Sequence, residues 1–412
     1  MIKSIKITNL YYIYSYDIDV VNESNVLILT GPNGFGKTTI LQIINHLCSL
    51  KLWYFYLLPF DRIELSFVDG INISIFKSCK DEHGYGDVEF SMRIGEEIET
   101  YTLSKEFVEQ KARQCSSIFR TSDNGKLDEN LETYPNDDLI AFFNTKMPVM
   151  VSFIETQKCT MIEEQRLVIR KVLRNDAKYS RTVEEIQTKI SEFYAEAQKA
   201  YNSASLKIDG SFVKRLSDIE PTNKVKHIKK EKIYKEVVQK IADYKKYDLV
   251  GELDVVSDLG VHYNEVLKLY LTDLNSKLSS IDRYYDKLST FDRLVSGKRL
   301  AYKKLLFKDD KMQVVGDNGH EIPIRKLSSG EQNLLVLCHN LVFGLDEKNV
   351  LLIDEPENSM HIAWLQNLLD DYISIAKSTG CQIIIATHSP AFIHGKWNLT
   401  YDLCENGTIQ ES

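Results

Sequence analysis

The stretch Gly31-Pro32-Asn33-Gly34-Phe35-Gly36-Lys37-Thr38 decides the fold class of this chain. It directly follows the apolar run 26–30, and apolar residues at helical spacing follow it between Ile40 and Leu47. The order therefore predicts a buried strand, a tight loop and a helix. The pattern G-x-x-x-x-G-K-[ST] in this setting is typical of a loop whose backbone N–H groups surround phosphate oxygens.

This loop predicts a site for ATP and Mg²⁺. Lys37 is expected to reach the β- and γ-phosphates, and the Thr38 hydroxyl is expected to bind Mg²⁺. The helix that follows adds the positive end of its dipole to the phosphate site. The residues expected to contact the nucleotide in this loop are Asn33, Gly34, Gly36, Lys37, Thr38 and Thr39.

A second motif is the apolar run Leu351-Leu352-Ile353, which ends in Asp354-Glu355-Pro356. The carboxyl end of a buried parallel strand lies at the sheet edge where ligands bind. We therefore expect Asp354 to contribute to the magnesium site and Glu355 to act as the general base that polarises the attacking water. An acidic turn after an ordinary core strand is the alternative interpretation.

A third motif is Leu327-Ser328-Ser329-Gly330-Glu331-Gln332, followed by apolar residues at helical spacing. Ser329 with Gln332 three residues later is a capping-box arrangement, so an ordinary helix start is one interpretation. In the functional interpretation the helix N-terminus binds the γ-phosphate held by a neighbouring subunit. The residues predicted to contact nucleotide here are Ser328, Ser329, Gly330 and Glu331.

Residues 327–332 are similar to the signature motif of ABC ATPases, and their position between the two other motifs matches the order in that family. The resemblance implies that His388, in Ala386-Thr387-His388-Ser389-Pro390, is the switch histidine that contacts the γ-phosphate. It also implies a Q-loop glutamine that touches magnesium and the attacking water. Residues 151–157 look like a strand running into this loop, so Gln157 is the preferred candidate and Gln165 the alternative.

Together these motifs resemble the ABC/SMC/OLD-like ATPases, over roughly residues 1–60 and 300–400. Transporters and SMC proteins usually carry Asp where His361 stands. The run Asp-Glu-Pro-Glu followed by His361 is instead similar to small ATPases of bacterial conflict systems. These include the PtuA-like ATPases of Septu and of retron operons, the ATPase of PARIS systems and the OLD-family nucleases. By this resemblance Ser359 and His361 are candidate interface residues.

The pattern predicts an α/β fold, an ABC-type ATPase head with a mainly parallel sheet, flanking helices and an antiparallel β subdomain. Residues 62–76 and 87–103 alternate apolar and polar, as expected of antiparallel strands attached to the main sheet. Dense charge and sparse Gly indicate an inserted helical arm. The expected boundaries are 1–161 for the N-terminal lobe of the head, 162–302 for the arm and 303–412 for the C-terminal lobe.

Composition limits the remaining alternatives. A net charge of −8 excludes a globally basic nucleic-acid binder. The seven cysteines form no C-x-x-C pair, which argues against a disulfide framework and a zinc cluster. No signal peptide and no apolar run long enough to span a membrane are visible, so we expect a cytoplasmic protein without membrane contact.

Two clusters keep open interpretations. Nine lysines between 224 and 246 indicate either a solvated helix face or a surface for nucleic acid or a partner. They are Lys224, Lys226, Lys229, Lys230, Lys232, Lys235, Lys240, Lys245 and Lys246. Near the phosphate loop, Tyr11, Tyr12, Tyr14 and Tyr16 either pack in the core or provide a ring that stacks on adenine.

Two functions follow as hypotheses. The first is a nucleotide-gated scaffold and sensor of an anti-phage defence complex, which forms a homodimer or higher homo-oligomer through ATP between its heads. Because only 24 residues follow His388 and no His-Asn-His constellation is visible, the effector is expected to be another polypeptide, by resemblance an HNH nuclease. The second is a DNA-repair or DNA-clamping ATPase of the SMC type. The length of the arm and His361 disfavour a transporter subunit.

Overall fold

A computed structural model describes residues 1–78, 86–108, 137–163, 168–173, 176–219, 227–257, 263–298, 300, 302–344, 350–358 and 360–409. The chain divides into two compact units. The first comprises residues 1–166, 172–177 and 344–412, and the second comprises 167–171 and 178–343. Residues 303–343 thus group with the helical arm, whereas the sequence pattern assigns them to the head.

A five-stranded parallel sheet forms one layer of the first unit. Its order is β16 (Thr400–Asp402), β3 (Val26–Thr30), β15 (Gln382–Ala386), β14 (Val350–Asp354) and β8 (Cys159–Ile162). Every residue of β3, β14 and β15 is buried. Both faces of this sheet are covered, which is why its strands read as continuous apolar runs.

A seven-stranded antiparallel sheet forms a second layer. Its order is β17 (Thr408–Ile409), β2 (Tyr14–Asp19), β1 (Ile2–Leu10), β4 (Arg62–Phe67), β5 (Ile71–Ser78), β6 (Asp87–Ile94) and β7 (Glu97–Leu103). The predicted antiparallel strands are therefore present. They form a sheet of their own with β1 and β2, and are not added to the edge of the parallel sheet, because β1 pairs with β4.

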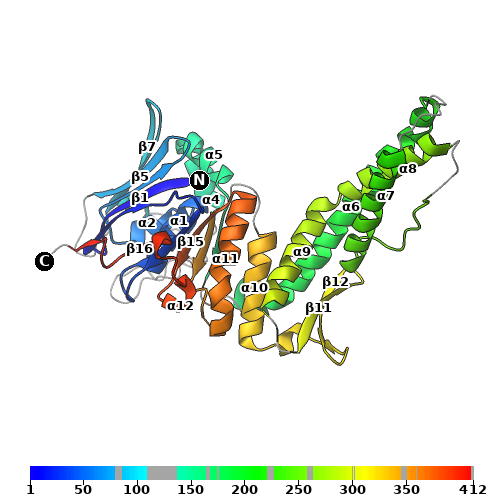
Figure 1. Cartoon of the computed structure of the whole chain (residues 1–412). Helices are drawn as coiled ribbons and strands as arrows, with labels where there is room; N and C mark the ends of the chain where they lie inside the picture. The colour runs from blue at the N-terminus through cyan, green and yellow to red at the C-terminus, as the bar shows by residue number, and fades with distance from the viewer. Residues whose placement is uncertain are drawn as a thin grey trace. The chain divides into compact units, whose positions relative to one another are not determined.

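Helix α1 (Lys37–Cys48) lies in the core that the two sheets share (Figure 1). Its buried residues, among them Ile40, Ile43 and Ile44, belong to the same apolar cluster as Ile5 of β1 and Leu352 of β14. Helix α11 (Ile362–Thr379) packs against β3 and β15. The smaller helices of this unit are α2 (Trp53–Leu57), α4 (Asp137–Lys146), α5 (Pro148–Thr156), α12 (Pro390–Ile393) and η4 (Trp397–Leu399).

One buried side chain joins the two sheets. The Gln382 amide at the start of β15 accepts a hydrogen bond from the Ile2 N–H at 2.9 Å. The same amide donates to the Ile2 carbonyl oxygen at 2.8 Å. Gln382 is fully buried, so these two bonds satisfy main-chain groups of β1 that water cannot reach.

The second unit contains the helical arm. Its helices are α6 (Thr182–Ser217), α7 (His227–Lys246), α8 (Asn264–Ser279) and α9 (Asp282–Gly297). Helix α6, with 36 residues, is about 54 Å long. The helical pattern predicted from residue 162 starts later, at Thr182, because β8, β9 (Val168–Leu173) and β10 (Asp176–Arg181) precede it.

A small sheet and a long helix complete the second unit. The sheet consists of β11 (Lys303–Lys308), β12 (Lys311–Gly316) and β13 (Glu321–Ile322). The short η3 (Ile324–Lys326) leads into α10 (Ser329–Phe343), which packs on α6 and α9. Within the arm, Arg215 of α6 forms an ion pair with the buried Asp273 of α8. Across the parts of the chain that the structure describes, no helix combines the length and apolarity needed to cross a bilayer.

Replacing Gln382 by Leu is expected to lower the free energy of unfolding by about 2–4 kcal/mol, because the buried N–H and C=O of Ile2 lose their partners. Urea unfolding followed by circular dichroism measures the change. The matched substitution Gln239→Leu, at an exposed position of α7, is expected to change stability by under about 0.5 kcal/mol. Equal midpoints for the two variants would show that the Gln382 bridge contributes nothing.

Candidate functional site

The loop 31–36 joins β3 to α1 and turns sharply at its glycines. Gly34 and Gly36 have φ of 91° and 84°, in the left-handed region that favours glycine. A Cβ on Gly36 would also lie 3.1 Å from Leu10 Cδ2, so a side chain there would press on Leu10 in addition to straining the backbone. Gly36 is the N-cap of α1, and the first backbone N–H groups of this helix lie at the end of the loop.

Lys37 and Thr38 open α1. The Lys37 side chain is buried, and its Nζ donates to the carbonyl oxygens of Gly31 at 2.8 Å and Pro32 at 3.2 Å. The Thr38 hydroxyl donates to Asp354 Oδ1 at 3.1 Å. The hydroxyl and the carboxylate come from positions 316 residues apart, and they provide adjacent oxygen ligands of the kind that Mg²⁺ prefers.

The register of the parallel sheet brings the acidic strand end beside the phosphate loop. Asp354 of β14 pairs with Ala386 of β15, and Ala386 pairs with Leu29 of β3. One residue beyond β14, Glu355 has a φ of 46°, uncommon for a side chain larger than glycine. Its N–H donates to the Ala386 carbonyl at 2.9 Å, which holds this strained residue at the sheet edge.

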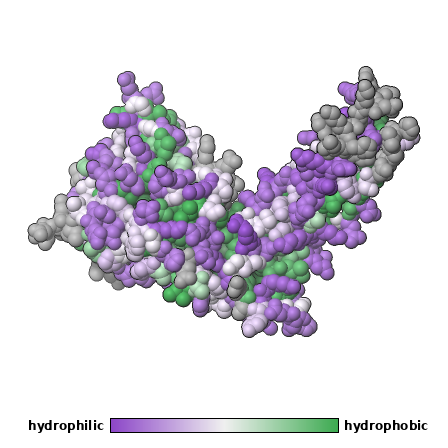
Figure 2. Space-filling view, viewed as in Figure 1, coloured by the Kyte–Doolittle hydropathy of each residue, from purple (hydrophilic) through white to green (hydrophobic). Residues whose placement is uncertain are grey.

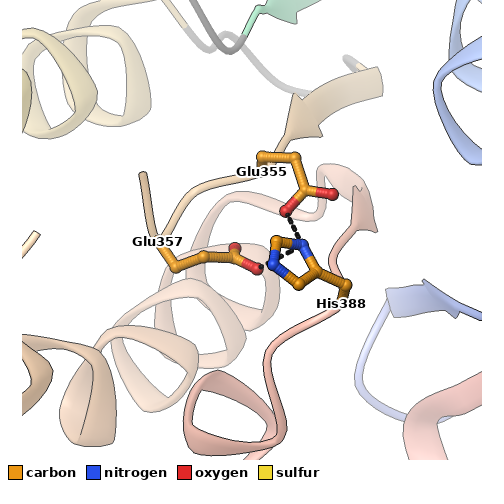
Figure 3. Close-up of side chains that lie close together, drawn as sticks. All are labelled: Glu355, Glu357 and His388. Atoms are coloured by element: carbon orange, nitrogen blue, oxygen red, sulfur yellow. Dashed lines mark hydrogen bonds and ion pairs between the residues drawn. The ribbon is translucent and has the colours of Figure 1, made fainter. Parts of the chain in front are cut away.

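Glu355, Glu357 and His388 lie together (Figure 3). His388 Nδ1 and Glu355 Oε2 are 2.6 Å apart, and the same nitrogen lies 3.6 Å from Glu357 Oε1. Burial and the neighbouring Glu357 carboxyl raise the pKa of Glu355 to about 7, and His388 opposes this rise. Glu355 is therefore a carboxyl group that can accept a proton near neutral pH.

A cavity of about 550 Å³ collects these residues at the carboxyl edge of the parallel sheet. This volume falls within the range that holds a small ligand. Its lining is Tyr11, Asn33, Gly34, Gly36, Lys37, Thr38, Thr39, Glu355, Asn358 and His388. All six predicted phosphate-loop residues thus share one cavity with Glu355 and His388. The donor atoms of Glu355, Glu357 and His388 also lie within 4.8 Å of one another, a spacing that could hold a divalent cation.

The tyrosine cluster separates into two roles. Tyr16 is buried and its hydroxyl donates to the Phe35 carbonyl at 2.7 Å, so it supports the phosphate loop from the core. Tyr14 packs against the Phe35 ring at 5.3 Å between centroids. Tyr11, which is 39% exposed, lines the cavity and shares a hydrogen bond of 2.9 Å with the Thr39 hydroxyl. Of these three rings, Tyr11 is the one placed to meet a ligand.

The signature-like segment lies in the second unit. The capping box involves Ser328 and Glu331, one residue earlier than the predicted pair Ser329 and Gln332. Ser328 N and Oγ both donate to Glu331 Oε2 at 2.9 Å, and Glu331 N lies 3.3 Å from Ser328 Oγ. Gln332 instead donates to the Leu327 carbonyl at 2.7 Å. Ser328 and Ser329 are exposed, so the tip of α10 is accessible.

Lys303 of β11 holds this helix tip in place. Its Nζ lies 2.7 Å from Glu331 Oε1. Burial opposes ionisation of Glu331, but the hydrogen bonds from Lys303 and Ser328 outweigh it and keep the pKa of this carboxyl below its usual value. Both carboxylate oxygens of Glu331 are occupied by donors from the protein, so this residue holds the start of α10 in its conformation.

The predicted strand over residues 151–157 is wrong, and so is the predicted position of Gln157 beside the nucleotide. Residues 148–156 form helix α5, with Pro148 at its first position, and not a strand. The strand β8 starts at Cys159 and pairs in parallel with β14. Gln157 therefore precedes the amino end of β8, at the sheet edge opposite the cavity. The alternative, Gln165, lies outside the described residues.

The remaining predicted residues are placed as follows. His361 is the N-cap of α11, and its Nδ1 accepts from the Ala363 N–H at 3.2 Å. Ser359 lies outside the described residues, as do Lys224 and Lys226. Among the side chains that the structure describes between residues 227 and 246, four lysines form ion pairs. They lie on a unit whose visible face is largely hydrophilic (Figure 2). These pairs are Lys232–Glu236, Lys240–Asp282, Lys245–Glu252 and Lys246–Asp292.

Sequence motifs alone did not single out three residues of this site. Glu357 and Thr387 lie inside quoted motifs, but only the fold shows that the two side chains meet. Asn358 lines the cavity from the same loop as Glu357. The sequence signal was the second acid in Asp-Glu-Pro-Glu, two residues after Glu355, which extends the acidic run at the end of β14.

Comparison with known proteins gives a family. A family model described as "AAA ATPase domain" matches residues 1–393. No curated protein matches the chain significantly. Among solved structures, the chain is similar to an SMC head domain from Pyrococcus furiosus with an extended coiled coil, bound to the C-terminal domain of ScpA. The identity is 12%, over 95% of this chain and 90% of that chain, with a TM-score of 0.34.

The chain is also similar to the SMC head domain from Thermotoga maritima, at 10% identity over 100% of this chain and 98% of that chain, with a TM-score of 0.35. The matched residues 1–393 include the phosphate loop, the acidic end of β14 and His388, which share one edge of the parallel sheet. The chain therefore belongs to the AAA ATPase domain family and is an ATPase.

Proposed function

We propose that two copies of this chain hold ATP and Mg²⁺ between their heads, as a nucleotide-gated scaffold and sensor of an anti-phage defence complex with a separate nuclease or toxin. The observation that carries the proposal is the open catalytic edge. Lys37, Glu355 and His388 line one cavity, yet the His388 side chain is 54% exposed. A second surface must cover this edge, because phosphoryl transfer needs water excluded and charge stabilised.

The phosphate loop binds the nucleotide through its backbone and Lys37. Its Nζ, which donates to the Gly31 and Pro32 carbonyls, exchanges these partners for β- and γ-phosphate oxygens when ATP binds. Thr38 and Asp354, already in contact, hold Mg²⁺. When bound, Mg²⁺ neutralises charge that develops on the phosphate oxygens. Tyr11 stacks on the adenine, supported by its exposed ring at the cavity wall.

Hydrolysis then uses the pair Glu355 and His388. The Glu355 carboxylate takes a proton from the attacking water, whose oxygen bonds to the γ-phosphorus while ADP leaves. A pKa of about 7 makes this carboxyl a stronger base than an exposed glutamate. His388, whose Nδ1 lies 2.6 Å from Glu355 Oε2, orients this carboxylate and contacts the γ-phosphate.

The tip of α10 from the second copy completes the site. Ser328, Ser329 and Gly330 are at the start of a 15-residue helix, whose N-terminal N–H groups attract anions. The Lys303–Glu331–Ser328 contacts hold this tip rigid, so it can bind the γ-phosphate in trans without reorganising. ATP therefore joins the two heads, and hydrolysis releases them.

The defence role rests on the motif resemblance. The run from Asp354 to His361 is similar to that of PtuA-like ATPases, which partner an HNH nuclease. In this proposal, opening and closing of the heads changes how the effector is held. The gating element is the ATP-dependent interface, since ligand binding shifts the equilibrium only through contacts that differ between the two states.

The second candidate is a DNA-clamping ATPase of the SMC type. The arm supports it, because α6 alone is about 54 Å long and offers an extended surface for a duplex. The lysines of α7 give it less support. Lys240 and Lys246 already pair with Asp282 and Asp292, so a phosphate would have to displace these carboxylates.

Glu355→Gln is expected to retain ATP binding and to slow turnover by at least about 100-fold, because the general base is lost. ATP then accumulates in the closed state, so light scattering with ATP should report a dimer. Lys37→Ala, which loses the phosphate ligand, is the control and should stay monomeric. A monomeric Glu355→Gln protein saturated with ATP would rule out the shared site.

Ser328→Arg and Gly330→Asp are each expected to abolish turnover while the altered chain still binds ATP, because the tip acts on the other copy's nucleotide. Mixing Ser328→Arg with Lys37→Ala tests this directly. Each mixed dimer has one intact site, formed by the phosphate loop of the first variant and the tip of the second. Turnover should reappear on mixing, and an inactive mixture in which the two folded variants form mixed dimers with ATP would contradict action in trans.

Affinity purification of the Glu355→Gln chain from its native host separates the two candidates. Co-purification of an HNH nuclease, a reverse transcriptase or a small toxin with the ATP-bound protein is the outcome expected for a defence scaffold. Recovery of a homodimer bound to DNA, lost after nuclease treatment and at high salt, would favour the clamp. Lys37→Ala serves as the matched bait that binds no nucleotide.

A further inference from the structure

Glu357 is a buried carboxylate between two loops of the catalytic edge. It follows Glu355 by two residues in the loop after β14, and its side chain is 8% exposed. Oε1 accepts a hydrogen bond from the Thr387 hydroxyl, in the loop after β15. The same oxygen lies 3.6 Å from His388 Nδ1. The Glu357 carboxylate therefore touches Thr387, the residue before the switch-like histidine. It also approaches His388 itself, as Figure 3 shows.

Thr387 transmits this contact to the backbone on either side of His388. The Thr387 side chain is fully buried, and its N–H donates to the Leu29 carbonyl of β3 at 3.1 Å. Its hydroxyl oxygen also accepts from the Ser389 N–H at 3.0 Å. The hydroxyl thus links Glu357 to the residue after His388. Removing Glu357 would therefore take away one restraint on the loop that carries the exposed imidazole.

Burying the Glu357 side chain does not stabilise the fold. Among the described residues its Oε2 has no hydrogen-bond partner, although it is shielded from solvent. An unsatisfied buried polar atom costs about 1–3 kcal/mol, and more when the group is charged. A residue kept at such a cost, within 3.6 Å of the catalytic pair, is typical of a site where activity and stability are in conflict.

We propose that Glu357 is a positioning residue for ATP hydrolysis, which fixes His388 against Glu355 through Thr387. The inference rests on the proposed roles of Glu355 and His388. Glu355 occupies a strained backbone conformation, and the His388 side chain is half exposed, so packing alone does not fix the imidazole ring. The Glu357–Thr387 contact supplies the missing restraint, since it connects the two loops that carry them.

The test compares Glu357→Ala and Glu357→Gln with the wild-type chain in steady-state ATPase assays. Glu357→Ala is expected to lower kcat by about 10- to 100-fold, the effect of misplacing a reacting group by about 1 Å. The KM for ATP and the affinity for a fluorescent nucleotide should stay within twofold, because Glu357 does not line the cavity. Glu357→Gln keeps an oxygen for the Thr387 hydroxyl, so it should retain more turnover than Ala.

Variants of Thr387 separate positioning from a general structural effect. Thr387→Val keeps the shape and removes the hydroxyl, so it should reproduce the loss of kcat, whereas Thr387→Ser should restore it. Combining Glu357→Ala with Thr387→Val should cost no more than the larger single effect, because both act through one contact. Thermal melting should show no loss of stability for Glu357→Gln. Glu23→Gln, exposed before β3, is the control.

Turnover of Glu357→Ala within twofold of wild type would overturn the inference. So would parallel losses of nucleotide affinity, melting temperature and kcat, which indicate a structural role. A different result would show that the proposed roles of Glu355 and His388 are wrong. If Glu355→Gln hydrolyses ATP like the wild type, the assignment of the base is wrong whatever Glu357 does. If Glu355→Gln is inactive and Glu357→Ala is active, only the positioning role fails.

Discussion

The hydrogen-bond ladder of the parallel sheet is the constraint on which the candidate site depends. Ile353 pairs with Ile385, and Ala386 pairs with Leu29, so β14, β15 and β3 end at the same level. The carboxyl ends of parallel strands lie at one edge of the sheet, so the residues that follow them come together there. A shift of register by one residue would turn each side chain to the other face. The phosphate loop, the acids after β14 and His388 meet because this ladder is uninterrupted.

Residues next to buried strands could be predicted from sequence, because local pattern and final position coincide there. The phosphate loop directly follows β3, and Asp354 is the last residue of β14. The apolar residues of each strand therefore indicated where the motif beside it lies. Gln157 failed for the opposite reason. A short, mostly apolar segment such as Val151-Ser152-Phe153-Ile154 does not distinguish a strand from a buried helix. Pro148 at the first helical position was the local signal for α5.

Contacts between distant segments could not be predicted. The shift of the capping box from Ser329 to Ser328 depends on Lys303, which draws Glu331 into an ion pair across the start of α10. Glu357 likewise takes its place from Thr387, 30 residues later. In both cases a carboxylate within a recognised motif is oriented by a partner from another strand or loop. The spacing of residues within a motif does not indicate which distant side chain will bind the carboxylate.

The bridge between Gln382 and Ile2 spans 380 positions, and its consequence concerns biosynthesis. At 5–20 residues per second, the ribosome needs roughly 20–80 s between the synthesis of β1 and the synthesis of Gln382. Throughout that interval β3 exposes an apolar edge without β15, while the arm helices close local contacts and fold early. Such high contact order slows folding. Nascent heads therefore carry an unpaired apolar strand edge, a surface prone to aggregation, until β15 has been made.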